Sequence, residues 1–272
     1  MKQRHKQIMD ILEEHGACSY QEFSEQLGVT TMTVRRDCEQ LATNGLVIKT
    51  LGGVQQAGAP SYFYESPLRS RVAVNREEKR AIAGKALELV DSGKTLFLDG
   101  STTCLQLAAL LVEERKRLTI VTNSALVAMT ASAGSENMVV GIGGQIDKDS
   151  ASFVGPIAEQ EIKKFFPDIA FISTKGFISR EGTFESAVGN LHIKQLIVSQ
   201  SSKVVLLVDH SKFDVRALCE AVNTSQIQAV VTDDATPKSE LASLRELGKE
   251  VYVADMGKRK KTVRVRKAVN VS

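Results

Sequence analysis

The 272-residue sequence lacks the features that define several classes of protein. No apolar run approaches the roughly 18 residues of a membrane helix, and the first residues, MKQRHKQIMD, lack the apolar region of a signal peptide. The four cysteines are scattered, with neither the C-x-x-C spacing of a zinc site nor the density of a disulfide framework, so we expect buried, reduced thiols. These absences predict a cytoplasmic protein with no membrane segment, no metal and no cofactor.

A general excess of positive charge is also lacking. The formal net charge is +3, but residues 258–272 carry seven Lys or Arg and no acid, which leaves 3 − 7 = −4 for residues 1–257. Residues 1–57 hold six Lys or Arg against seven Asp or Glu. Any argument for nucleic-acid binding must therefore depend on where the charges lie. The basic tail is either simply solvated or adds salt-dependent affinity for DNA of any sequence.

The length allows two domains. The pattern predicts a helical domain over residues 1–57, a linker without clear periodicity over 58–75, a larger domain over 76–257 and the basic tail over 258–272. In the first domain, apolar spacing predicts a helix over Lys6–His15. A capping box formed by Ser19 and Glu22 begins a second helix, and a third follows Thr30 or Thr31.

The third predicted helix directs its basic residues away from its apolar face. Val34, Cys38 and Leu41 recur at helical spacing on one face, while Arg36 lies almost opposite to them and Arg35 flanks it. Arginine can bond guanine edges or phosphates, and a helix N-terminus favours phosphate. The alternative is a three-helix bundle in which the arginine pair is only solvated.

The residues after this helix favour DNA binding over a plain bundle. Apolar residues flank Lys49 and lead into Gly52 and Gly53, which is typical of a β-ribbon wing with Lys49 placed to reach a phosphate. Three short helices followed by a ribbon make a winged helix-turn-helix. The predicted DNA contacts are Thr30, Thr31, Thr33, Arg35, Arg36, Lys49 and Gly52.

The larger domain alternates apolar strands with helices, which predicts an open, largely parallel α/β sheet. The predicted strands are Thr95–Leu98, Leu118–Val121, Met138–Ile142, Ile169–Ser173, Val204–Val208, Ala229–Val231 and Val251–Val253. In such sheets small molecules bind beyond the carboxyl ends of the strands. Polar clusters follow several strands here, and hydroxyls with free N–H groups and a lysine suit phosphate. Each cluster alone is more often a helix cap, but several together favour one anionic site.

Both halves of the sequence resemble a known family. The run from Val29 through Arg35-Arg36-Asp37 to the wing over 49–53 resembles the N-terminal domain of the DeoR family of bacterial transcriptional regulators. The strand-end clusters resemble its effector domain, whose fold is similar to ribose-5-phosphate and glucosamine-6-phosphate isomerases. The resemblance implies a repressor that binds a double-stranded DNA operator and senses a phosphorylated sugar, with Lys212 and the hydroxyl loops holding phosphate and Asp99 facing sugar hydroxyls. Because one module offers a small DNA interface, we expect a homodimer or homotetramer.

The sequence departs from the family pattern at three positions. Lys175 stands where an Asp is common, Asn190 where a Glu is usual, and Ser101 where a Gly is frequent. Two carboxylates suited to sugar hydroxyls are thus missing, which favours a more anionic ligand such as a sugar-acid phosphate or a bisphosphate. The alternative is an internal pair of Lys175 with Glu181 or Glu185 in a charged loop.

The second function considered is a sugar-phosphate isomerase with an appended helical domain. Enolisation requires a positioned general base, and the expected positions hold Lys175 and Asn190, so we predict a regulator without catalytic residues. The predicted effector contacts are Asp99, Ser101, Thr102, Thr103, Thr122, Asn123, Gly144, Lys175, Asn190 and Lys212.

Overall fold

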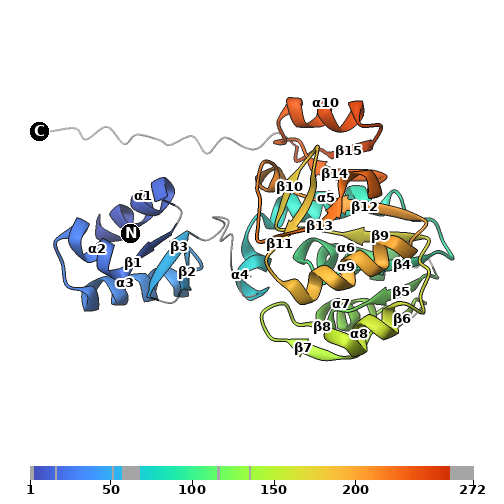
Figure 1. The fold of residues 1–272 in the computed structure, drawn as a ribbon, viewed down its shortest axis with the longest axis horizontal. Helices are drawn as coiled ribbons and strands as arrows, with labels where there is room; N and C mark the ends of the chain where they lie inside the picture. The colour runs from blue at the N-terminus through green and yellow to red at the C-terminus, as the bar shows by residue number, and fades with distance from the viewer. Residues whose placement is uncertain are drawn as a thin grey trace, which may run out of the picture.

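The computed structural model describes residues 3–15, 17–50, 52–56, 68–114, 117–134 and 136–257, and the chain forms a small N-terminal body and a larger α/β body (Figure 1). The predicted basic tail and residues 58–67 of the predicted linker lie outside the described residues. No helix in the described part of the chain has the length and apolar character needed to cross a membrane.

The N-terminal body is a winged helix-turn-helix. Its elements are α1 (Gln3–His15), β1 (Ala17–Ser19), α2 (Tyr20–Leu27), α3 (Thr31–Thr43), β2 (Val47–Thr50) and β3 (Gly53–Gln56). The predicted capping box is present, because the Glu22 N–H donates to Ser19 Oγ and the Ser19 N–H donates to the Glu22 carboxylate. Thr30 caps α3 by accepting from the Thr33 N–H. All three helices are present as predicted, except that α1 begins at Gln3 and not at Lys6.

The wing is a three-stranded antiparallel sheet in the order β1-β3-β2, one strand more than predicted. Strand β1 has only three residues, and its partner β3 follows much later in the chain, so no local sequence pattern predicts this strand. A Cβ at Gly53 would lie 2.3 Å from the Cys18 carbonyl oxygen, which explains why a glycine stands where the two strands meet. Val34, Cys38 and Leu41 are fully buried in this body's core, as predicted.

The larger body is built around a seven-stranded sheet in which every neighbouring pair is parallel. The order is β15-β14-β12-β9-β4-β5-β6. Its strands are β4 (Thr95–Leu98), β5 (Thr119–Thr122), β6 (Met138–Gly141), β9 (Ile169–Ile172), β12 (Lys203–Leu207), β14 (Ala229–Asp233) and β15 (Glu250–Ala254). All seven predicted strands are present, because continuous apolar runs are typical of strands buried on both faces.

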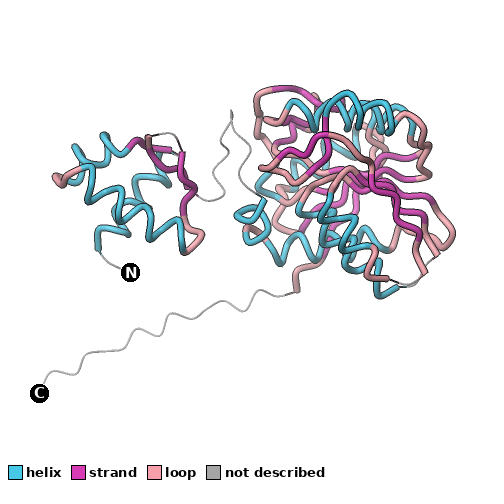
Figure 2. The backbone as a smooth tube through the Cα atoms, turned by 90° about the horizontal axis from the view of Figure 1, so that it is seen from below, coloured by secondary structure: helices cyan, strands magenta, loops and turns pink. Residues whose placement is uncertain are grey.

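Helices cover both faces of this sheet (Figure 2). One face packs on α5 (Arg76–Leu87), α6 (Thr102–Glu114) and α7 (Ala125–Ala131), and the other on α8 (Gly155–Ile162), α9 (Val188–Gln200) and α10 (Lys238–Glu246). Along each strand, successive side chains pack alternately against the helices on one face and on the other. In β4, Leu96 and Leu98 pack toward α5 and α6, while Phe97 packs toward α8 and α9.

Three parts of the larger body differ from prediction. A hairpin of β7 (Gln145–Asp147) and β8 (Ser152–Val154) precedes α8 where a loop was expected. A second small sheet joins β10 (Gly176–Ile178), β11 (Gly182–Glu185) and β13 (Cys219–Asn223), so the expected charged loop before Glu185 contains a buried strand. A short helix, α4 (Leu68–Ala73), lies within the predicted linker. Strands of three to five residues and a helix of six residues are too short for periodicity to reveal.

Candidate DNA-binding and effector sites

The N-terminal half of α3 presents an exposed polar face. Thr31, Arg35 and Arg36 are exposed, and Met32 keeps 74% of its surface. The Arg35 guanidinium lies 5.2 Å from the centre of the Tyr20 ring on α2, which orients it by a cation–π contact. Thr30 and Thr33 bond one another through their hydroxyls at 3.0 Å. The geometry agrees with a helix whose outer face enters a DNA groove.

The acidic residues of this body are held mainly by local partners. Glu22 belongs to the capping box, and Glu25 accepts a hydrogen bond from Gln21. Asp37 is buried against Arg4 and His5 of α1; burial by itself would raise the pKa of its carboxyl, but hydrogen bonds from these two side chains lower it. Among the described residues Arg36 forms no ion pair, while the side chains of residues 13 and 14 lie outside the description. The arginine face is thus not neutralised by an acid that the structure describes.

Lys49 of the wing is engaged in a way that the sequence did not predict. Its Nζ lies 3.2 Å from a carboxylate oxygen of Glu39, on the exposed side of α3. Both side chains are about half exposed, and such surface pairs contribute at most about 1 kcal/mol. Lys49 can therefore exchange Glu39 for a DNA phosphate at little cost. Gly52 forms the turn between the two wing strands, with a φ of 87°.

A cavity opens where the order of the large sheet reverses. From β4 the chain runs outward to β5 and β6, and then returns to β9 on the other side of β4. Ligands of open α/β proteins bind outside the carboxyl ends of strands at such a point. The cavity's volume of ≈ 120 Å³ is on the order of ten times the 10–15 Å³ that one water needs. It therefore has room for a small organic molecule.

Asp99 joins the two strands at this point. It follows β4, and its Oδ2 accepts a hydrogen bond of 2.8 Å from the Ser173 N–H, which follows β9. Its Oδ1 accepts from the Ser101 N–H, at 3.0 Å, just before α6. Both carboxylate oxygens thus hold the loops that form the cavity wall. A ligand hydroxyl would have only the remaining lone pairs of Asp99 as acceptors.

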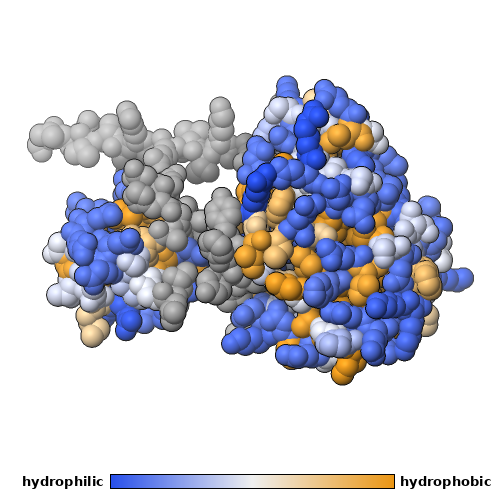
Figure 3. Space-filling model, in the orientation of Figure 1, coloured by the Kyte–Doolittle hydropathy of each residue, from blue (hydrophilic) through white to orange (hydrophobic). Residues whose placement is uncertain are grey.

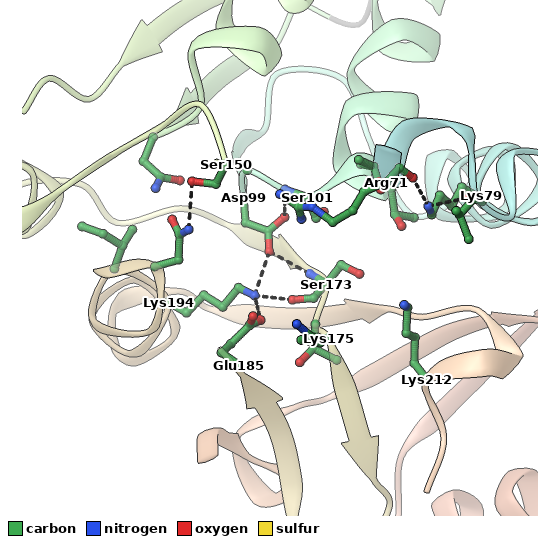
Figure 4. Close-up of a pocket in the computed structure, with 18 of the residues that line it drawn as sticks. Arg71, Lys79, Asp99, Ser101, Ser150, Ser173, Lys175, Glu185, Lys194 and Lys212 are labelled. Atoms are coloured by element: carbon green, nitrogen blue, oxygen red, sulfur yellow. Dashed lines mark hydrogen bonds and ion pairs between the residues drawn. The ribbon is translucent and has the colours of Figure 1, made fainter. Parts of the chain in front are cut away.

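A buried ionic cluster forms the floor of the cavity (Figure 4). Lys194 of α9 forms a close ion pair with Glu185 of β11, donates to the Ser173 carbonyl, and lies 3.4 Å from Asp99 Oδ2. Each of the three charged residues is less than a tenth exposed. Buried charges are tolerated when they are paired and hydrogen-bonded, as here.

The charges around the cavity favour an anion. Its lining holds five cationic and two anionic side chains; the cations are Arg71, Lys79, Lys175, Lys194 and Lys212. The N-terminus of α6 adds Thr102 and Thr103 to the lining, and a helix N-terminus carries partial positive charge. Asn123 is 2% exposed; its amide nitrogen donates to the Phe153 carbonyl, and no described residue hydrogen-bonds to its Oδ1. The wall therefore combines positive charge with an acceptor that a ligand hydroxyl can satisfy.

Comparisons with known proteins agree for both bodies. Residues 4–57 match the model of the DeoR-like helix-turn-helix domain, and residues 74–234 match that of the DeoR C-terminal sensor domain. The chain is 32% identical to the glycerol-3-phosphate regulon repressor of Escherichia coli K12, over 90% of this chain and 95% of that protein. The chain belongs to the DeoR family. It is accordingly a DNA-binding transcriptional regulator and not an enzyme.

Other members of the DeoR family are similar over most of their length. The transcriptional repressor AccR of Agrobacterium fabrum is 28% identical, over 86% of this chain and 90% of that protein. Among solved structures, ribose 5-phosphate isomerase A from Methanocaldococcus jannaschii has a TM-score of 0.38 at 20% identity, over 51% of this chain and 55% of that one. For eIF2B delta from Chaetomium thermophilum the TM-score is 0.43 at 15% identity, over 58% and 56% of the two chains.

The structure of this DeoR-family chain brings most of the predicted effector residues to one cavity. The residues that line it are Asp99, Ser101, Thr102, Thr103, Asn123, Lys175, Asn190 and Lys212. Thr122 and Gly144 do not line it. Thr122 is fully buried and its hydroxyl accepts from the Ser124 N–H, while a Cβ at Gly144 would meet Ala158 of α8 at 3.0 Å. Thr122 is the last residue of β5 and contributes to a turn, whereas Gly144 follows β6 and lies against α8.

The cavity also contains an acid that the sequence analysis did not place there. Glu185 lines the cavity beside Asp99, so the sensor domain keeps two acids there although Lys175 and Asn190 depart from the family pattern. Glu181 and Glu185 were considered as partners of Lys175; Glu181 also pairs with Arg216 and Glu185 with Lys194, and the internal pair of Lys175 stays a prediction. Asn190 instead donates to Ser150 Oγ at 3.1 Å and ties α9 to the β7–β8 hairpin.

Sequence reasoning missed Lys194, although a signal was present. Lys194 lies on the buried stripe of α9 together with Leu191, Ile197 and Val198. A lysine at such a position is uncommon unless it is paired, so it indicates a buried acid nearby. The sequence could not say which acid, since β11 reaches this place only through the small sheet that was not predicted.

Proposed function

We propose that this DeoR-family regulator is a repressor that leaves its operator when a phosphorylated sugar or sugar-acid derivative binds the cavity at the ends of β4 and β9. It would act on double-stranded DNA in the cytoplasm. The observation that carries the proposal is the excess of cationic side chains around the α6 N-terminus, at the place where an open sheet binds ligands. The similarity to a glycerol-3-phosphate regulon repressor agrees with a phosphate-bearing effector.

Lys175 supports the finer part of this proposal. It follows β9 and lines the middle of the cavity between Glu185 and Lys212 (Figure 4). A cation at this position favours a ligand that carries a carboxylate or a second phosphate besides the first one. A hydrogen bond to a charged group contributes about 1.5–3 kcal/mol, which is enough to select a sugar-acid phosphate over a sugar phosphate that has no carboxylate.

A thermal-shift panel on the full chain tests the proposed ligand class. Ribose 5-phosphate, glucose 6-phosphate and 6-phosphogluconate are compared with the unphosphorylated sugars and gluconate. A ligand at 100 times its Kd stabilises the native state by about 2.7 kcal/mol, so we expect an increase in Tm only with the phosphorylated compounds, greatest with 6-phosphogluconate.

The Lys175→Met variant completes this test. It should reduce the shift with 6-phosphogluconate to that with glucose 6-phosphate, whereas Lys203→Met, which removes a surface lysine from the same domain, should change neither. Equal shifts with phosphorylated and unphosphorylated sugars would exclude a phosphate-selective cavity. Loss of all binding in Lys175→Met would show that the lysine does not discriminate between the two ligands.

We further propose that the chain works as a homodimer or homotetramer. The surface in Figure 3 is mainly hydrophilic but broken by apolar areas on the larger body. Met129 of α7 and Met138 of the edge strand β6 keep 71% and 60% of their surface, and these two elements pack together. An edge strand with exposed apolar side chains suits contact with a second copy.

A further inference from the structure

Helix α4 lies between the parts of the chain that the family models cover. The helix-turn-helix model ends at residue 57 and the sensor model begins at residue 74, whereas α4 spans Leu68–Ala73. Its Arg71 nevertheless lines the effector cavity, and Leu68 is 8% exposed. The helix is thus a part of the cavity wall as well as the last element before the sensor domain.

Both ends of α4 are tied to loops that border the cavity. At its start, the Leu68 N–H donates to the Asp149 carbonyl at 2.9 Å, next to Ser150 in the β7–β8 hairpin. Just after its end, Asn75 Nδ2 donates to Asp209 Oδ1 at 3.0 Å, in the loop after β12. Ser150 and Lys212 from these two loops lie on opposite sides of the cavity in Figure 4. Helix α4 therefore connects the two sides.

A buried lysine holds the end of α4. The Lys79 Nζ of α5 donates to the carbonyls of Arg71 and Val74, at 2.7 and 2.6 Å, and Lys79 is 6% exposed. The pKa of this ammonium is lowered to about 8, chiefly by burial; Lys212 and Arg71 also lower it, whereas Asp209 and Glu78 raise it. A charged donor makes strong hydrogen bonds to these carbonyls, so Lys79 fixes the end of the helix. Because Arg71 of α4 lines the cavity, an anion bound there adds a contact to the helix and should hold α4 more firmly.

We propose that α4 acts as a strap across the effector cavity. Lys79 fixes the carbonyls at the end of this helix, and an anionic effector that binds Arg71 holds the helix more firmly in place. The inference rests on the proposed function, because it requires an anion in the same cavity. The chain that precedes α4 leads to the winged helix. A change in the mobility of α4 is therefore transmitted along the chain to the DNA-binding domain. An effector can release DNA only if it binds the DNA-free arrangement more tightly than the DNA-bound one, and its contact with α4 would supply this difference.

Hydrogen–deuterium exchange of the full chain with inorganic phosphate tests the strap. In the wild-type protein, at a phosphate concentration ten times Kd, amides of residues 68–74 and of residues 100–104 at the start of α6 should exchange about tenfold more slowly. Lys79→Met, measured at ten times its own Kd, should keep the protection of residues 100–104 and lose that of residues 68–74. Lys85→Met, the same change on the same helix at a partly exposed pair with Glu88, should match the wild type.

A second variant tests the strap independently, in case Lys79→Met does not fold. Asn75→Gly removes the bonds to Asp209 and Ser211 but tolerates the positive φ of 49° at this position. It should also weaken the protection of residues 68–74. Protection of residues 100–104 without protection of residues 68–74 in the wild type would overturn the strap and leave the proposed function standing. Protection of neither segment would overturn the proposed anion site itself.

Discussion

Lys194→Met is expected to destabilise the sensor domain by about 3–5 kcal/mol, because it leaves two buried carboxylates without their shared cation. Asp99 and Glu185 are both less than a tenth exposed and both lie against Lys194 Nζ. Methionine replaces the length of the side chain but none of its charge or hydrogen bonds. Urea unfolding of the sensor domain, followed by circular dichroism, measures the loss.

Lys203→Met is the matched control for this prediction. Lys203 pairs with Glu250 at 2.8 Å, but the two side chains are 31% and 49% exposed, so the loss should not exceed about 1 kcal/mol. Adding Glu185→Gln to Lys194→Met should recover part of the stability, since one of the uncompensated charges is removed. Equal losses in the two lysine variants would show that the buried cluster is not an ionic one.

Arg36→Ala is expected to weaken operator binding by about 1–3 kcal/mol, or roughly 5- to 150-fold, if the guanidinium bonds a base edge. Arg36 is exposed on α3, and no ion pair within the described chain competes for it. The operator is first obtained by selecting binding sites from randomised duplexes with the full chain. Fluorescence anisotropy then gives the affinity of each variant for the selected duplex.

Two measurements make the Arg36 result specific. Arg80→Ala, the same change at an exposed arginine on α5, should leave DNA affinity unchanged. The thermal shift caused by a bound sugar phosphate should be the same in Arg36→Ala as in the wild type, because the arginine lies in the other domain. Wild-type operator affinity in Arg36→Ala would remove this residue from the interface.

The sequence predicted those parts of the fold that depend on neighbouring residues. The capping box at Ser19, the Thr30 cap and the apolar face of α3 are all set within one or two helical turns. The seven core strands were found because residues such as those of β9 are buried on both sides of the sheet and are apolar without interruption.

Two parts of the site that the sequence did not predict depend on contacts with distant residues. Strand β11 carries Glu185 to the cavity only because it pairs with β13, more than thirty residues later in the chain. The contribution of Arg71 depends on α4, whose position is fixed by contacts to Asp149 and through Lys79. The polar residues at strand ends were identified, but which of them face the cavity was decided by the hairpin and the small sheet.

The most direct test of the account is the coupling between the two domains. The full chain is titrated with the selected operator duplex, with and without the phosphorylated compound that gives the largest thermal shift. We predict that the compound weakens operator binding at least about fivefold, and that saturating operator weakens binding of the compound by the same factor. A compound that stabilises the sensor domain but leaves operator affinity unchanged would contradict the proposal that this cavity controls DNA binding.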